Sequence, residues 1–196
     1  MSERLRVREA ARQHISIVAF GVAYLVGFLA YGLLAGSRLT IAYAVTIVVV
    51  GLVVARAHAT VGFSRGLLWS LAAWGFLHMA GGLIEFTEAV LYNVSWGVPV
   101  LRYDRLVHAF GFGATTALCW QVLRRRAGIP TVTTAIAVIV WLGGMGFGAI
   151  NEVVEFIISR LTQTNVGGFV NTGYDLIFNA LGTASVAIWL RVNRTT

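Results

Sequence analysis

Acidic residues and a histidine recur at helical spacing in the second half of the chain. Asp104 and His108 lie four residues apart, and Glu152 and Glu155 lie three apart. On a helix, either spacing puts both side chains on the same face. Carboxylate oxygens and an imidazole nitrogen together suit a divalent cation. The sequence therefore predicts metal ligands at Asp104, His108, Glu152 and Glu155.

A divalent ion held in this way would polarise a phosphate or an ester, or activate water. Asp175 would serve as a further ligand or as the general base, and a neighbouring arginine would bind a phosphate through two hydrogen bonds. The predicted catalytic residues are Asp104, His108, Glu152, Glu155 and Asp175. The predicted substrate-binding residues are Arg102, Arg105, His78, Glu85, Asn151 and Asn179.

Structural explanations remain open for the same residues. Asp104 could lie at a helix N-terminus and interact with its dipole. Asp175 follows Thr172 in a T-x-x-D pattern typical of a capping box. Glu88 could simply be solvated at the membrane interface. The acids together could also form an ion-paired network with the nearby arginines.

Composition identifies the class of protein that must hold these residues. Of the 196 residues, 58% are hydrophobic and 12% are charged, about half of the charge of a soluble domain. The mean hydropathy is +0.78. This composition excludes a disordered chain, and the single cysteine, Cys119, excludes a disulfide-stapled module. An all-α, polytopic membrane protein is the class that fits.

Six apolar runs approach the length of about 20 residues that a membrane span needs. We expect a six-helix transmembrane bundle forming one domain over residues 1–196, after a cytoplasmic basic tail at 1–14. The apolar run after the tail is longer than the roughly 7–15 apolar residues of a signal peptide, and no convincing cleavage site follows, so we expect it to be retained. The predicted spans are 15–36, 40–55, 66–92, 104–123, 131–159 and 174–192.

The arginines predict that both termini are cytoplasmic. Eleven of the fifteen arginines then fall on the cytoplasmic side, as the positive-inside rule requires. Arginines spread between apolar runs do not make a nucleic-acid surface, whereas residues 124–126 suit anionic lipid. With this orientation, the acids outside the tail all lie in the outer half of the membrane, where Tyr92, Trp96 and Tyr103 suit an outer aromatic belt.

Two further segments bear on the site. Glycines crowd the predicted spans, above all at residues 143–148, and small residues let membrane helices pack closely. The uncharged, glycine-rich segment 163–173 is either a lid over the acids or a plain connector.

Four stretches resemble the YjdF-type family of bacterial inner-membrane proteins. They are LHMAGGLIE (77–85), RYDRLVHAFGFG (102–113), GAINEVVEF (148–156) and GFVNTGYDLIFNALG (168–182). The D-R-x-x-H segment also resembles, more loosely, VanZ-like proteins linked to cell-envelope lipids. The resemblance implies a multi-pass protein of the bacterial inner membrane and supplies no reaction. The resemblance implies that the polar residues characteristic of the family are, in this chain, Asp104, Arg105, His108, Asn151, Glu152, Glu155, Asp175 and Asn179.

Three functions therefore stay open. The first is a metal-dependent hydrolase or transferase that acts on a lipid or lipid-linked envelope substrate at the outer leaflet. The second is a proton-coupled transporter, for which His78 would be an ionisable group near the membrane midplane. The third is a scaffold or assembly partner whose acids form an ion-paired plug.

Overall fold

The computed structural model describes residues 9, 11–86, 89–98, 100–161 and 168–193. Six of its helices are long and apolar enough to cross a membrane, which confirms the expected all-α polytopic class. The helices fall into two compact units, Met1–Ile84 and Glu85–Thr196. The expected single domain over residues 1–196 and the cytoplasmic termini stay predictions.

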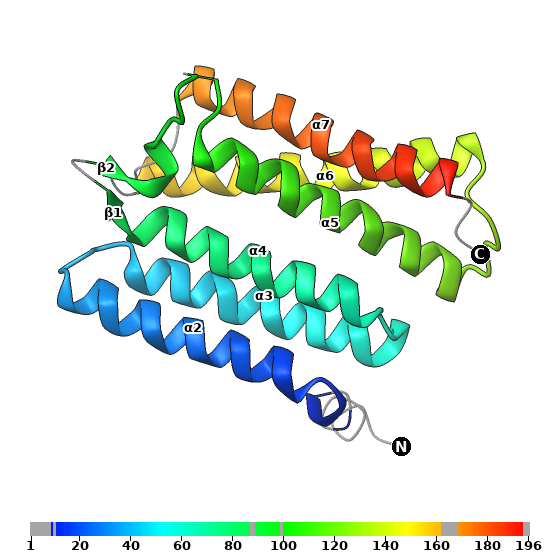
Figure 1. Ribbon diagram of the computed structural model, residues 1–196, viewed down its shortest axis with the longest axis horizontal. Coiled ribbons are helices and arrows are strands. Elements are labelled where there is room, and N and C mark those ends of the chain that lie inside the picture. The colour runs from blue at the N-terminus through cyan, green and yellow to red at the C-terminus, as the bar shows by residue number, and fades with distance from the viewer. Residues whose placement is uncertain (1–8, 10, 87–88, 99, 162–167, 194–196) are drawn as a thin grey trace. The chain divides into compact units, whose positions relative to one another are not determined.

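The first unit contains three helices that alternate in direction along the chain, and each contacts the other two (Figure 1). They are α2 (Ile15–Leu34), α3 (Thr40–Val61) and α4 (Arg65–Leu83). Ser64 caps α4 by accepting a hydrogen bond from the Leu67 amide. A close contact between Gly82 and the Tyr43 ring joins α4 to α3.

The second unit begins with a compact connection. A two-stranded hairpin, β1 (Glu85–Phe86) and β2 (Ala89–Val90), precedes the short 3₁₀ helix η1 (Leu91–Asn93). The three aromatic residues predicted to form the outer belt lie close together here, since the Tyr103 ring is 6.1 Å from the rings of both Tyr92 and Trp96. The Tyr103 amide also donates to the Val94 carbonyl, which ties the connection to the helix that follows.

Three long helices then pack pairwise against one another (Figure 1). They are α5 (Tyr103–Arg126), α6 (Thr134–Leu161) and α7 (Phe169–Val192). Helices α5 and α7 run parallel, because positions near 108 meet 179 and positions near 113 meet 182. Helix α6 runs the opposite way, so its C-terminal half lies beside the N-terminal halves of α5 and α7.

Glycines set how closely these three helices approach. A Cβ atom at Gly182 would overlap the backbone of Ala109 on α5, and one at Gly144 would overlap the Thr116 hydroxyl. At the end of the unit formed by the C-terminal halves of α5 and α7, the apolar side chains of Trp120, Val140 and Leu190 are buried together. The close packing predicted from the glycines is therefore present, and it brings polar side chains of different helices together.

Several helix boundaries differ from the predicted spans. The third helix ends at Leu83 rather than 92, because acids are unfavourable at a helix C-terminus and the segment that follows is rich in β-branched and aromatic residues. The second helix continues past Arg56 to Val61, since a long arginine reaches out from a helix end. The sixth begins at Phe169, five residues earlier than predicted. The other bounds move by up to three residues.

Substituting Gly182 by alanine should destabilise the second unit, because its Cβ would meet the Ala109 backbone, which cannot move aside. We expect a loss of about 1–3 kcal/mol, typical of overpacking. The measurement is thermal unfolding in detergent, with Gly146→Ala as the matched control, since a Cβ there meets nothing within 4 Å. Equal stability of the two variants would contradict this account of the packing.

The topology is tested by fusing green fluorescent protein or alkaline phosphatase to the C-terminus in a bacterial host. The arginine distribution predicts fluorescence and no phosphatase activity, because both termini should be cytoplasmic. The opposite pattern would place the acidic residues on the cytoplasmic side.

Candidate functional site

Five ionisable side chains from three helices converge in the second unit. We call them the polar cluster: Asp104 and His108 on α5, Glu152 and Glu155 on α6, and Asp175 on α7. Asp104, His108, Glu152 and Asp175 are all at most 6% exposed, and Asp175 is fully buried. Such burial is rare for charged groups unless they are paired or bind an ion.

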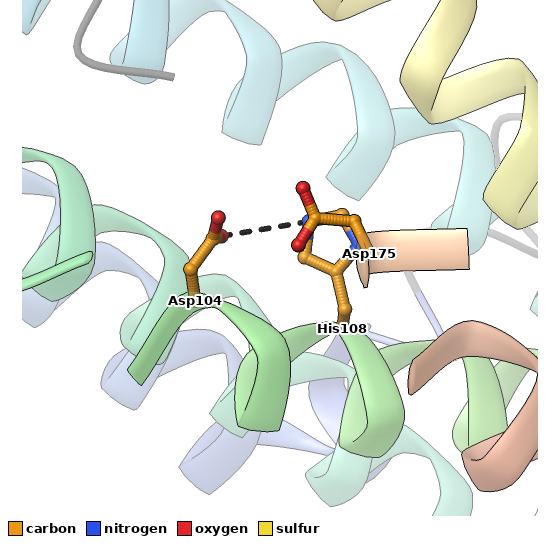
Figure 2. Close-up of side chains that lie close together, drawn as sticks. All are labelled: Asp104, His108 and Asp175. Carbon is orange, nitrogen blue, oxygen red and sulfur yellow. Dashed lines mark ion pairs between the residues drawn. The ribbon is translucent and has the colours of Figure 1, made fainter. Parts of the chain in front are cut away.

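The His108 ring lies at the centre of the cluster. Its Nε2 atom is 3.5 Å from Asp104 Oδ1 and 3.9 Å from Glu155 Oε1. Its Nδ1 atom is 3.6 Å from Glu152 Oε1. Asp175, which comes from the neighbouring helix (Figure 2), has a carboxylate oxygen within 4.8 Å of a His108 nitrogen. One imidazole is therefore approached by carboxylates from all three helices.

Three asparagines hold the cluster from its edges. Asn179 Oδ1 lies 3.1 Å from His108 Nδ1, at hydrogen-bonding distance. The Asn151 amide donates to Glu155 Oε1 at 2.7 Å, and the Asn171 amide donates to Asp175 Oδ2. Groups that orient a ligand by hydrogen bonding are typical of metal sites.

Several carboxylate oxygens of the cluster have no hydrogen-bond partner in the described part of the chain. They are Oδ1 of Asp175 and both oxygens of Glu152, which the Thr172 and Asn151 side chains approach without hydrogen-bonding geometry. Leaving a buried acceptor unsatisfied costs about 1–3 kcal/mol, and more for a charged group. Asp175 also interacts electrostatically with Asp104, Glu152 and Glu155. The cluster is thus a set of like charges facing one another around one ring.

Two arginines lie beside the cluster at the start of α5. Arg105 is 4% exposed; its guanidinium stacks on the Tyr174 ring at 4.0 Å and donates to the Val100 carbonyl. Arg102 precedes the first residue of α5 and is half-buried. Both contribute positive charge near Asp104. The N-termini of α5 and α7 point to the same end of the unit, and their dipoles also favour anions there.

A glycine on α6 leaves space for an asparagine side chain beside the cluster. Gly148 on α6 faces Asn179, and a Cβ at this position would lie 2.7 Å from Asn179 Nδ2. Any larger residue would displace the amide that contacts His108. Threonines continue the polar path into the unit: Thr183 donates to the Asn179 carbonyl and Thr116 to the Phe112 carbonyl.

The predicted site residues separate into two groups. The five predicted catalytic residues come together, with Asn151, Asn179, Arg102 and Arg105 beside them. His78 belongs instead to the first unit, where its ring lies 5.1 Å from that of Tyr43. Glu85 is exposed in β1, so its expected place in a helix was wrong. Glu88 lies outside the described residues.

The capping explanation for Asp175 is wrong, because Asp175 is the seventh residue of α7 rather than its start. Asp104 does lie in the first turn of α5, but the side chain of the N-cap residue, Arg102, makes no capping bond. Within segment 163–173, residues 163–167 lie outside the described ones, and 169–173 begin α7. Asn171 in this turn was not predicted, although its i, i+4 spacing to Asp175 could have identified it.

The donor atoms fit a divalent cation. Two groups of three residues have ligand atoms all within 4.8 Å of one another: Asp104, His108 and Asp175, and His108, Glu152 and Glu155. The oxygens and one nitrogen suit Mn²⁺, Fe²⁺, Zn²⁺ or Mg²⁺.

Without a bound cation, Glu152→Gln should stabilise the protein, because it removes one of four mutually repelling buried charges. We expect a gain of roughly 0.5–2 kcal/mol, the usual size for a stabilising substitution. Thermal unfolding with a chelator present measures it, and Glu9→Gln, at an exposed position, is the matched control. A loss of stability in Glu152→Gln alone would instead indicate a structural hydrogen-bond network.

Comparison with known proteins identifies the family to which the chain belongs. No curated protein and no solved structure matches the chain. Residues 16–196 match the model of a family described as "Predicted membrane protein (DUF2238)", in keeping with the YjdF-type resemblance. The match does not extend to VanZ-like proteins. Because it covers all six spanning helices and every residue of the polar cluster, this integral membrane protein belongs to the DUF2238 family.

Proposed function

We propose that the polar cluster binds a divalent cation and that the protein is a membrane-embedded, metal-dependent hydrolase or transferase. Its substrate would be a lipid or lipid-linked molecule of the cell envelope. The observation that carries this proposal is the pairing of three carboxylates with His108, with Asp175 in a ligand group within 4.8 Å and buried carboxylate oxygens that lack hydrogen-bond geometry.

The spacing of the ligand atoms supports an ion between them. Direct hydrogen bonds join donor and acceptor at about 2.7–3.2 Å, whereas the nitrogens of His108 lie 3.5, 3.6 and 3.9 Å from the carboxylate oxygens. Two ligands, each about 2.1 Å from a tetrahedral metal ion, are roughly 3.4 Å apart. The two ion pairs at Nε2 are therefore longer than a direct hydrogen bond, and their spacing is close to that of two ligands around one ion.

The charge of the site supports a divalent ion. With all four carboxylates ionised, as in a metal-bound site, Asp104, Glu152, Glu155 and Asp175 carry four negative charges, and Arg102 and Arg105 beside them return two positive charges. With His108 neutral, the remainder is a net charge of −2. One divalent cation balances it without placing a net charge inside the membrane, where an unpaired charge is costly.

The neighbouring residues take distinct roles in this proposal. Asp104, His108, Glu152 and Glu155 bind the ion, and Asp175 is a further ligand or the general base. Arg102, half-buried with an unpartnered Nε atom among the described contacts, binds a substrate phosphate.

The remaining predicted substrate-binding residues divide by their contacts. Arg105 stacks on Tyr174 and so supports the position of α7. Asn151 and Asn179 hydrogen-bond cluster residues, so we assign them to positioning rather than to substrate contact. His78 and Glu85 stay predictions.

The proposal also includes the location. With both termini cytoplasmic, as the arginines predict, the cluster opens toward the outer leaflet of a bacterial inner membrane. Envelope lipids and their phosphate-bearing precursors would reach it from the bilayer. A bound metal would supply a Lewis acid for the phosphate or ester oxygen, or lower the pKa of a bound water.

Metal analysis of gently purified protein by mass spectrometry tests the binding step. The proposal predicts near-stoichiometric divalent metal in the wild type and in Glu9→Gln, and at least a tenfold reduction in Asp104→Asn and Glu152→Gln. Absence of metal from all four proteins after divalent cations are offered would refute it. The transporter and scaffold alternatives would then lead.

Envelope lipid profiles of a deletion strain test the enzymatic step. Strains complemented with Asp104→Asn or Glu152→Gln should accumulate the same lipid species as the deletion, whereas Glu9→Gln should restore the wild-type profile. Unchanged profiles in all strains would leave a metal-binding protein without this activity. Function restored by replacing the acids in pairs with apolar residues would favour the scaffold.

A further inference from the structure

The two nitrogens of His108 have different surroundings. Nδ1 faces Asn179 Oδ1 at 3.1 Å, within hydrogen-bonding distance. Nε2 faces two carboxylates at 3.5 and 3.9 Å, both beyond that distance. A neutral histidine carries its hydrogen on one nitrogen and binds a metal through the other.

We infer that Asn179 is a positioning residue that keeps the hydrogen of neutral His108 on Nδ1 and so makes Nε2 the metal-binding atom. This inference rests on the proposed metal site. An amide oxygen can only accept a hydrogen bond, so a bond to Nδ1 requires the hydrogen to be on that nitrogen. The lone pair of Nε2 then points to the side of Asp104 and Glu155, where the gap fits an ion.

The packing around Asn179 holds its side chain beside His108. The side chain is fully buried, and its Nδ2 atom lies against Gly148 of α6. Thr183 donates to the Asn179 carbonyl at 2.7 Å and so occupies the backbone acceptor. The side-chain Nδ2 has no hydrogen-bond partner among the described residues, while Oδ1 faces His108.

The amide is also the side chain that the charge of the site favours. Aspartate at 179 would accept the same hydrogen bond but would add a fifth anion to the cluster. Apolar replacements would leave Nδ1 without this acceptor, with only the more distant Glu152 carboxylate at 3.6 Å. An uncharged acceptor orients the ring and leaves the balance with one divalent ion unchanged.

Nuclear magnetic resonance of metal-free, ¹⁵N-histidine-labelled protein in nanodiscs tests the inference directly. The ring signals are assigned by comparison with His108→Gln and recorded at a pH where the ring is neutral. We expect the hydrogen on Nδ1 in the wild type, in Asn179→Asp and in the control Asn193→Ala, which changes the C-terminal end of the same helix. In Asn179→Ala the hydrogen should move wholly or partly to Nε2.

Titration with Zn²⁺ and Mn²⁺ then connects the ring to the metal. Asn179→Ala should bind about 10- to 100-fold more weakly, the usual effect of losing such a partner, and Asn193→Ala should bind as the wild type does. A hydrogen on Nε2 in the wild type would overturn the inference, as would unchanged affinity in a folded Asn179→Ala.

The two proposals fail in different ways. If the wild type binds neither ion, the proposed metal site fails, and the resonance measurement still decides what Asn179 does to His108. If Asn179→Ala does not fold, the wild-type ring and Asn179→Asp decide the outcome: the inference stands only if both carry the hydrogen on Nδ1.

Discussion

Negative charge buried inside a membrane-spanning unit is the constraint on which the rest of this protein depends. Asp104, Glu152 and Asp175 lie at most 6% exposed on three different helices, where neither water nor lipid can solvate a carboxylate. Their charge must be balanced by groups inside the unit. Two arginines supply part of that balance, and with His108 neutral and all four carboxylates ionised the remaining −2 is the charge that the proposed divalent cation would balance.

Close helix packing makes the convergence possible. In lipid, helices associate through packing and polar contacts rather than through the hydrophobic effect, so contact surfaces must fit closely. Gly182 and Gly144 allow α5, α6 and α7 to approach. Gly148 then leaves the space that Asn179 occupies beside His108. The same residues that pack the unit therefore also position its polar groups.

Apolar and polar side chains lie at opposite ends of the second unit along the helix axis. Trp120, Val140 and Leu190 form an apolar core at one end, roughly 18 Å along α5 from His108 at 1.5 Å per residue. Threonines such as Thr116 lie between the two ends and satisfy their hydroxyls on carbonyls of their own helix. Apolar packing at one end can thus stabilise an assembly whose other end is destabilised by like charges, a common property of functional sites.

Hydropathy and i, i+4 spacing are local properties, so the all-α class, the presence of six spanning helices and the five residues of the polar cluster could be predicted without a structure. The prediction placed Glu85 in a helix because hydropathy alone extends the span, whereas α4 ends at Leu83, before the acids and the β-branched and aromatic residues that disfavour its continuation. The sequence also could not place Asp175 inside a helix rather than at its cap. The contact between Asn179 and Nδ1 of His108 could not be predicted in this way, because it depends on the register between α5 and α7, which are distant in sequence.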